Sequence, residues 1–94
     1  MKNKSFNIFF KIFGRVQGVG YRVWTKRVAM KYSLNGWVKN CNDKTVECEV
    51  NGGKEEINNF VRECHKGPML SSVKKILREE RPNKQYKSFI ILYK

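Results

Sequence analysis

Residues 5–22 read SFNIFFKIFGRVQGVGYR, and a change of pattern within them sets the architecture of the chain. The first part, Ser5–Phe13, is rich in Phe and Ile and predicts an inner β-strand. Residues 14–20 then contain three glycines, which indicates a loop and predicts the end of the strand. From Tyr21 onward apolar residues recur with helical spacing, so the loop is expected to join a strand to a helix.

The rest of the chain predicts four more strands and one more helix. The helix that begins at Tyr21 should bury one face, formed by Tyr21, Thr25, Val28, Ala29 and Tyr32. The second helix should bury Ile57, Phe60, Val61 and Cys64, and Gly67-Pro68 should end it. The later strands are predicted at Trp37–Cys41, Thr45–Val50, Ser72–Arg81 and Tyr86–Tyr93. This order predicts an α+β ferredoxin-like sandwich, an antiparallel sheet with two helices on one face.

Length and composition predict one domain over residues 1–94. The chain is 40% hydrophobic and 13% aromatic, which is enough for one core and argues against disorder. No segment approaches the ~20 apolar residues of a membrane span, so we expect a soluble, cytoplasmic protein. Cys41, Cys48, Cys64 and the single His65 lack metal-ligand spacing. The sequence therefore predicts no metal, and reduced cysteines that serve as small apolar residues.

The net charge of +12 is distributed unevenly. Residues 1–42 contain nine basic side chains and no acid, whereas residues 43–94 contain eleven bases and all eight acids. A negatively charged partner is therefore expected to meet the N-terminal half. Nucleic acid, anionic lipid and a small phosphorylated molecule all remain open on this ground.

The glycine-rich loop before the first helix is a candidate anion site. Backbone N–H groups at a helix N-terminus converge on anions, and Gly18 and Gly20 permit the positive φ that such a loop needs. Arg22 follows directly and could bind a phosphate through two hydrogen bonds. The alternative is a simple tight connection with Arg22 on the surface. Asn40 could likewise orient a water molecule, or could only begin the turn that follows it.

Two segments together resemble a known family. Residues 14–22, GRVQGVGYR, resemble the first acylphosphatase signature, Gly-x-Val-Gln-Gly-Val-x-(Phe/Tyr)-Arg. Residues 36–47, GWVKNCNDKTVE, resemble the second, Gly-(Trp/Tyr)-Val-x-Asn-x-x-Asp-Gly-x-Val-Glu. Further matching positions extend the resemblance over effectively the whole chain.

The resemblance implies an enzyme that hydrolyses the carboxyl-phosphate anhydride of an acyl phosphate to a carboxylate and inorganic phosphate. It implies no metal and no cofactor, a small-molecule substrate, and a monomer as the default. Arg22 would bind the phosphate and Asn40 would position the attacking water. The phosphate cradle would be formed by the backbone of Gln17, Gly18, Val19, Gly20 and Tyr21.

The sequence departs from the family pattern at Lys44, where glycine is usual, and at Leu92, where a basic residue is frequent. Lys44 puts the geometry of its hairpin turn in doubt, and we expect small effects on stability. The substrate's acyl group and the roles of the three cysteines stay open.

Two other functions compete with the enzyme as explanations of this sequence. A nucleic-acid binder of the same fold would use strand aromatics, for which Phe9, Phe10 and Phe13 are candidates. Glu47 and Glu49 on the third predicted strand would repel a phosphate backbone, which argues against nucleic acid. The second rival is a catalytically idle module, because the family also includes a domain at the front of a larger carbamoyl-handling maturation protein. The presence of Arg22 and Asn40 favours an active enzyme.

Overall fold

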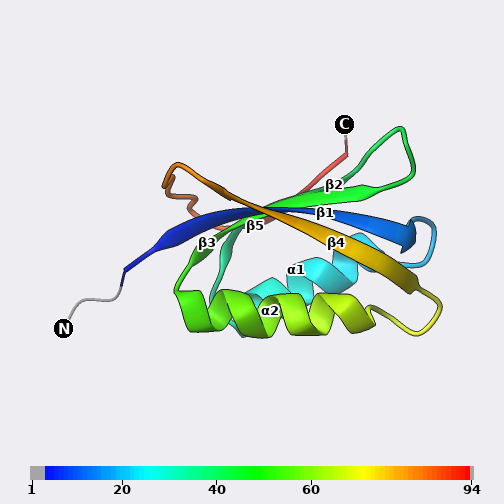
Figure 1. The fold of residues 1–94 in the computed structure, drawn as a ribbon, viewed down its shortest axis with the longest axis horizontal. Helices are drawn as coiled ribbons and strands as arrows, with labels where there is room; N and C mark the ends of the chain where they lie inside the picture. The colour runs from blue at the N-terminus through cyan, green and yellow to red at the C-terminus, as the bar shows by residue number, and fades with distance from the viewer. Residues whose placement is uncertain (1–3, 94) are drawn as a thin grey trace.

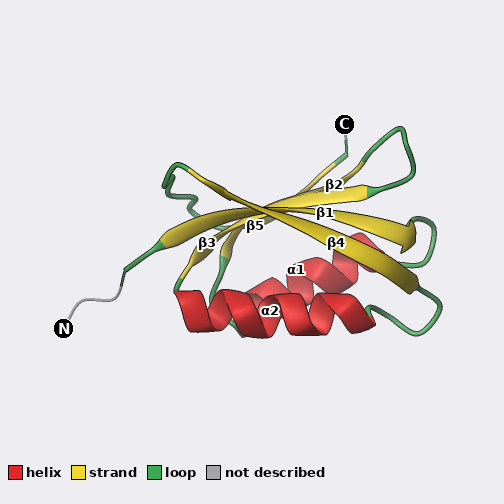
Figure 2. Ribbon diagram, in the orientation of Figure 1, coloured by secondary structure: helices red, strands yellow, loops and turns green. Residues whose placement is uncertain are grey.

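One five-stranded sheet and two helices make up the computed structural model, which describes residues 4–93 (Figure 1). In chain order the elements are β1 (Phe6–Arg15), α1 (Tyr21–Lys31), β2 (Asn35–Asn40), β3 (Val46–Gly52), α2 (Lys54–Lys66), β4 (Ser72–Arg81) and β5 (Phe89–Leu92). The strands lie in the order β4-β1-β3-β2-β5. Both helices pack against the same face of the sheet (Figure 2). This confirms the predicted α+β ferredoxin-like sandwich.

The sheet is mixed rather than wholly antiparallel. Three neighbouring pairs run antiparallel, but β5 runs parallel to β2. The reason lies in the connection after β4, because β4 and β5 occupy opposite edges of the sheet. Residues 82–88 carry the chain along one end of the sheet from one edge to the other. β5 therefore begins at the end where β4 stops, runs opposite to β4 and lies parallel to β2. The strand predicted at Tyr86–Tyr93 is correspondingly shorter, at Phe89–Leu92.

The first strand is longer than predicted, because Gly14 continues it. β1 runs to Arg15, and its pairing with β4 shifts register between Phe13 and Gly14. Gly14 has a φ of 132°, and a Cβ there would lie 2.1 Å from the carbonyl oxygen of Ser72. Glycine at this position thus permits a bulge and a close approach to β4 rather than ending the strand.

The core lies between the sheet and the helices. β1 and β3 contribute alternate residues that are almost fully buried, namely Ile8, Phe10, Ile12, Val46, Cys48 and Val50. The helices contribute Tyr21, Thr25, Val28, Ala29, Ile57, Phe60 and Cys64. These are the faces that helical spacing predicts, except that Tyr32 and Val61 are only half-buried. Burial raises the pKa of the Cys48 thiol well above its usual value and that of Cys64 to about 12, so both stay protonated in the core.

The opposite face of the sheet mixes aromatic and charged side chains, since Phe9 and Trp37 flank Glu49 there, and Glu49 is only 6% exposed. Asn7, itself buried, donates a hydrogen bond of 2.6 Å from Nδ2 to Glu49 Oε2. Arg81 lies 3.7 Å from the other carboxylate oxygen. The acid is therefore buried together with its partners, a local network that the sequence does not reveal.

Candidate functional site

The loop between β1 and α1 leads into a helix whose N-terminus has no side-chain cap. Gly18 and Gly20 have φ values of 73° and 79°, in the left-handed region that favours glycine. Gly20 is the N-cap, and the first hydrogen bond of the helix joins the Trp24 N–H to the Gly20 carbonyl at 3.0 Å. The N–H groups of residues 21–23 consequently have no acceptor within the helix. The first turn also carries no acidic residue.

This uncapped helix start opens into a small hollow of about 100 Å³. Its lining comes from the loop, the first turn of α1 and the end of β2: Val16, Gly18, Gly20, Tyr21, Arg22, Val23 and Asn40. The structure thus brings Arg22 and Asn40 into one site, although 18 positions separate them in the sequence. The antiparallel pairing of β2 with β3, and of β3 with β1, places the end of β2 at the same end of the sheet as the end of β1.

Arg22 is half-buried at the second position of α1. Its guanidinium carbon lies 4.9 Å from the centre of the Tyr93 ring, a distance suited to a cation–π contact. Within residues 4–93 no carboxylate forms an ion pair with it. The charge of Arg22 is therefore uncompensated beside a helix terminus that is already positive.

Asn40 is the last residue of β2, and its carboxamide is turned inward. Its Oδ1 atom is buried and meets no hydrogen-bond donor in the described part of the chain. An unsatisfied buried acceptor of this kind costs about 1–3 kcal/mol relative to a paired one. A water molecule or ligand that donates a hydrogen bond in the hollow would remove that cost.

Three of the five predicted cradle residues turn their side chains into the protein. Gln17 Nε2 donates to the carbonyl oxygens of Cys41 and Thr45 at 2.8 and 2.9 Å. Val19 packs against the core, and the buried Tyr21 ring donates its hydroxyl to the Cys64 carbonyl at 2.6 Å. Of these three residues only Tyr21 lines the hollow, whereas Gln17 and Val19 lie outside its lining.

The turn that follows Asn40 is held by a backbone cap from Asp43, as its turn residues predict, and by ion pairs that the sequence did not single out. The Asp43 carboxylate accepts a hydrogen bond of 3.1 Å from the Thr45 N–H and pairs with Lys11 Nζ at 3.1 Å. Hydrogen bonds from the Thr45 hydroxyl and amide, then that from Lys11, lower the pKa of Asp43 to about 2. Lys11 also pairs with Glu47 at 3.1 Å. The one sequence signal was the lysine in an otherwise apolar part of the first strand.

Lys44 adopts the backbone conformation that glycine would favour. Its φ is 72°, and its N–H donates to the Cys41 carbonyl at 3.1 Å across the turn. A non-glycine residue in this region costs roughly 1–2 kcal/mol. The departure from the family pattern at this position therefore affects backbone strain rather than the hollow itself.

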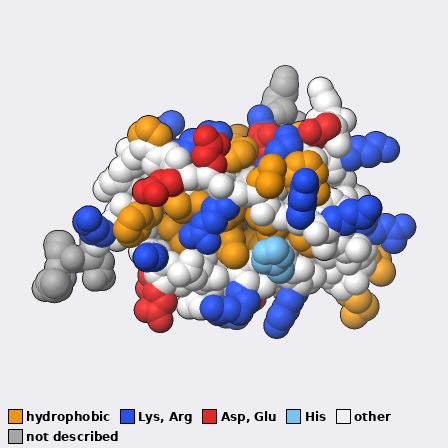
Figure 3. All heavy atoms as spheres, viewed as in Figure 1, with side chains coloured by type: hydrophobic (Ala, Val, Ile, Leu, Met, Phe, Trp, Pro, Cys, Tyr) orange, Lys and Arg blue, Asp and Glu red, His pale blue; other side chains and the backbone are white. Residues whose placement is uncertain are grey.

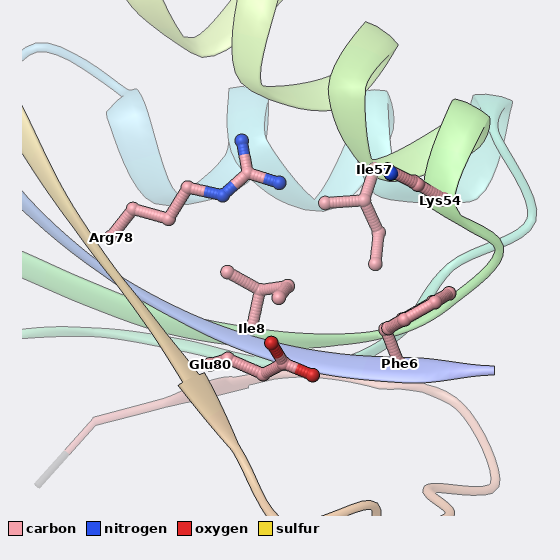
Figure 4. A pocket seen from close by; sticks show the side chains of 6 residues that line it. All are labelled: Phe6, Ile8, Lys54, Ile57, Arg78 and Glu80. Carbon is pink, nitrogen blue, oxygen red and sulfur yellow. The ribbon is translucent and has the colours of Figure 1, made fainter.

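A second hollow, of about 190 Å³, lies at the other end of the sheet (Figure 4). Ile8 and Ile57 contribute apolar side chains to it, with Arg78 and Glu80 reaching in from β4. Apolar atoms are visible between β4 and α2 in the space-filling view (Figure 3). None of the predicted site residues lines this hollow. Among residues 4–93 no cluster of His, Cys, Asp and Glu suited to a metal ion is found, and no helix is long and apolar enough to cross a membrane.

Comparison with known proteins gives a consistent result over nearly the whole chain. Residues 8–91 match the family model for Acylphosphatase. An acylphosphatase of Clostridium acetobutylicum is 42% identical over 84 residues, which are 88% of this chain and 92% of that protein. The crystal structure of an acylphosphatase from Bacillus subtilis superposes with a TM-score of 0.91 at 35% identity, covering 94% of this chain and 99% of that one. Full-length HypF contains a similar domain, with a TM-score of 0.88 at 34% identity over 98% of this chain and 12% of that protein.

Proposed function

The chain belongs to the acylphosphatase family, enzymes that hydrolyse acyl phosphates, and we propose that the hollow between the β1–α1 loop and Asn40 is its active site. The observation that carries this proposal is the meeting of three features in one small space. They are an uncapped helix start, the unpaired cation of Arg22 and the unpaired acceptor of Asn40. The first two suit the phosphate of the substrate, and the third suits a water molecule.

Phosphate binding would use the backbone together with one side chain. The backbone N–H groups of residues 17–21 would supply a partial positive charge, and the dipole of α1 would add to it. Gly18 and Gly20 leave room, since a Cβ at either position would meet no atom within 4 Å. The Arg22 guanidinium would leave the Tyr93 ring and bind two phosphoryl oxygens. The loop amides would be preorganised for the charge that develops on the phosphoryl oxygens, and Arg22 would join them on binding.

Asn40 would hold the attacking water through its Oδ1 atom, which accepts a hydrogen bond from it. The water oxygen forms a new bond to phosphorus while the bond from phosphorus to the acyl oxygen breaks. The bonding electrons leave with the carboxylate, one proton of the water passes to a phosphoryl oxygen, and the other stays on the oxygen that is now bonded to phosphorus. A carboxylate is a good leaving group, so no strong general acid is needed. Positioning and electrostatic stabilisation supply the acceleration.

The proposed reaction uses no metal and no cofactor, because Arg22 and the loop amides themselves provide the positive charge that the phosphoryl group requires. We propose a single domain over residues 1–94 that acts as a monomer on a small soluble acyl phosphate. The cytoplasm is the proposed compartment, since reducing conditions keep Cys41, Cys48 and Cys64 as free thiols.

Nucleic acid is not part of the proposal, because the aromatic side chains that would stack on bases are already engaged. Phe10 is buried in the core. Phe9 lies under the Arg81 guanidinium at 4.0 Å, and Phe13 lies under Lys75 at 4.8 Å. Stacking of bases would have to displace both cations.

The decisive experiment is hydrolysis of benzoyl phosphate in the presence of EDTA. We expect turnover by the parent protein, and a loss of about 10²–10³-fold in Arg22→Ala and in Asn40→Ala, comparable to the loss of one hydrogen-bonding group from an active site. Arg27→Ala and Asn42→Ala are matched controls, because both side chains are exposed and lie outside the hollow.

Different results would reject catalysis, the metal-free mechanism and the roles of the two residues. A folded parent protein without turnover would reject catalysis by this chain. Activity abolished by EDTA and restored by a divalent cation would reject the metal-free mechanism. Full activity in Arg22→Ala or Asn40→Ala would reject the role of that residue.

A further inference from the structure

We infer that the Gln17 side chain is a positioning residue that links the phosphate-binding loop to the turn carrying Asn40. The inference rests on the proposed function, because it concerns how two parts of the same site are held together. Gln17 belongs to the loop, yet its Nε2 atom reaches the β2–β3 turn at the Cys41 and Thr45 carbonyls. Cys41 directly follows Asn40 in the chain.

The carboxamide of Gln17 is well matched to this task. Its nitrogen carries two hydrogens, and the two carbonyls accept one each at 2.8 and 2.9 Å. The same two residues close the turn, since the Cys41 N–H donates to the Thr45 carbonyl at 2.9 Å. Gln17 therefore joins both sides of the turn at once, directly beside the last residue of β2.

This arrangement fixes the distance between the phosphate and the water. The backbone next to Gln17 would bind the phosphoryl group, while its side chain holds the turn from which Asn40 projects. Misplacement of a reacting group by about 1 Å can cost roughly 10²-fold in rate. Loss of the link should therefore lower kcat, because Asn40 drifts. It should change KM little, since Arg22 and the loop amides still bind phosphate.

The turn has a second support that does not involve the loop. Lys11 and Thr45 both bind the Asp43 carboxylate, at 3.1 Å from Lys11 Nζ and 3.1 Å from the Thr45 N–H. A variant at Gln17 should consequently keep a folded turn and lose only its connection to the loop. The variants below are expected to fold for this reason.

The first test is steady-state hydrolysis of benzoyl phosphate by Gln17→Met and Gln17→Glu. Methionine has a similar length but no donor, and glutamate would set an oxygen against two carbonyl oxygens. We expect kcat to fall about 10–100-fold in Gln17→Met and at least as far in Gln17→Glu, with KM within about threefold of the parent value. Gln85→Met is the matched control, an exposed glutamine between β4 and β5.

A double-mutant cycle distinguishes positioning from general destabilisation. If Gln17 acts through Asn40, Gln17→Met should cause no further loss of kcat in an Asn40→Ala background. Multiplicative losses in the double variant would overturn the inference, and so would a parent-like kcat in Gln17→Met. Asn40→Ala with full turnover would instead reject the proposed function, so the two failures are distinguishable.

An NMR titration with inorganic phosphate gives a readout that does not depend on turnover. In the parent protein, phosphate should shift the amide signals of Gly18 and Gly20 and also those of Cys41 and Thr45. In Gln17→Met the loop signals should still shift, while those of the turn should not. Turn signals that still respond would overturn the inference. Should Gln17→Met fail to fold, Gln17→Asn, which keeps the amide on a shorter side chain, takes the same tests with the same expected outcomes.

Discussion

The two helices lie side by side on one face of the sheet but begin in opposite ways (Figure 2). Both start after a glycine and neither has a side-chain cap. The first turn of α2 carries Glu55 and Glu56 beside a single cation, Lys54, whereas that of α1 carries no acid and includes the cation Arg22. Their ends are alike, because both place basic residues in the last turn. The difference is therefore confined to the two starting points.

The difference shows which helix has its N-terminal partial charge neutralised by its own side chains. Acids near a helix N-terminus neutralise its partial positive charge, and α2 has two of them. A Cβ on Gly53 would lie 2.3 Å from Glu56 Oε1, so this carboxylate folds back over the start of α2. α1 instead adds a positive side chain to a positive end. That arrangement lowers stability until an anion binds, and α1 is the helix that faces the proposed phosphate site.

The largest effect is expected when the first turn of α1 receives an acid like those of α2. Val23, the third residue of α1, is 52% exposed and lines the hollow. In Val23→Glu, we expect kcat/KM for benzoyl phosphate to fall about 10²-fold, because a carboxylate then competes with the phosphate for the same amides. The free energy of unfolding should rise by about 0.3–1 kcal/mol. Val23→Gln, of equal size but neutral, controls for shape, and equal activity in the two variants would contradict the interpretation.

A bound anion should remove the difference between the two helix starts. Inorganic phosphate should therefore stabilise the parent protein, by about 2.7 kcal/mol at a concentration 100 times its Kd. Urea unfolding with and without phosphate, at equal ionic strength maintained with sodium chloride, measures the effect. In Arg22→Ala the stabilisation at the same phosphate concentration should be much smaller. Equal stabilisation of the parent protein and of Arg22→Ala would show that phosphate binds at another site.

The glycines before the two helices should differ in their tolerance of a side chain. Gly20 has a φ of 79°, so Gly20→Ala should lower the free energy of unfolding by roughly 1–2 kcal/mol. Gly53 has a φ of −75° and a ψ of 156°, which alanine adopts readily. Gly53→Ala should therefore cost about 0.5–1 kcal/mol through loss of a favoured cap residue, and the flexible Glu56 side chain has to turn away from the new Cβ. Denaturant unfolding of both variants tests this, and an equal cost at the two sites would contradict it.

The sequence predicted the elements because each has a local signal. Helical spacing from Tyr21 and from Ile57 marks both helices, and Ser72–Arg81 matches β4 in full. Errors arose where a distant partner decides the outcome. Gly14 has the look of a loop residue, but its close approach to Ser72 keeps it in β1.

Some features of the candidate site could likewise be predicted from the sequence, and others could not. The motifs identify Arg22 and Asn40 as candidates, and the fold brings both to one hollow. The two hydrogen bonds from the Gln17 side chain span 24 and 28 positions, and the ion pair of Lys11 with Asp43 spans 32. No local sequence pattern predicts contacts between positions so far apart. Contacts of this kind depend on strand register, which the predicted elements alone do not determine.

The smallest expected effect lies at α2, where the acids should matter for stability and not for catalysis. Glu55→Gln and Glu56→Gln should each lower the free energy of unfolding by about 0.3–1 kcal/mol at low salt. Glu56→Gln should have the larger effect, because its carboxylate lies back over Gly53. Both losses should shrink in 1 M sodium chloride, since salt at about 1 M reduces the Debye length to roughly 3 Å. Hydrolysis of benzoyl phosphate should match the parent rate in both variants. A loss of activity comparable to that of Val23→Glu would mean that the two helix starts are not independent, and the contrast between them would no longer identify the phosphate site.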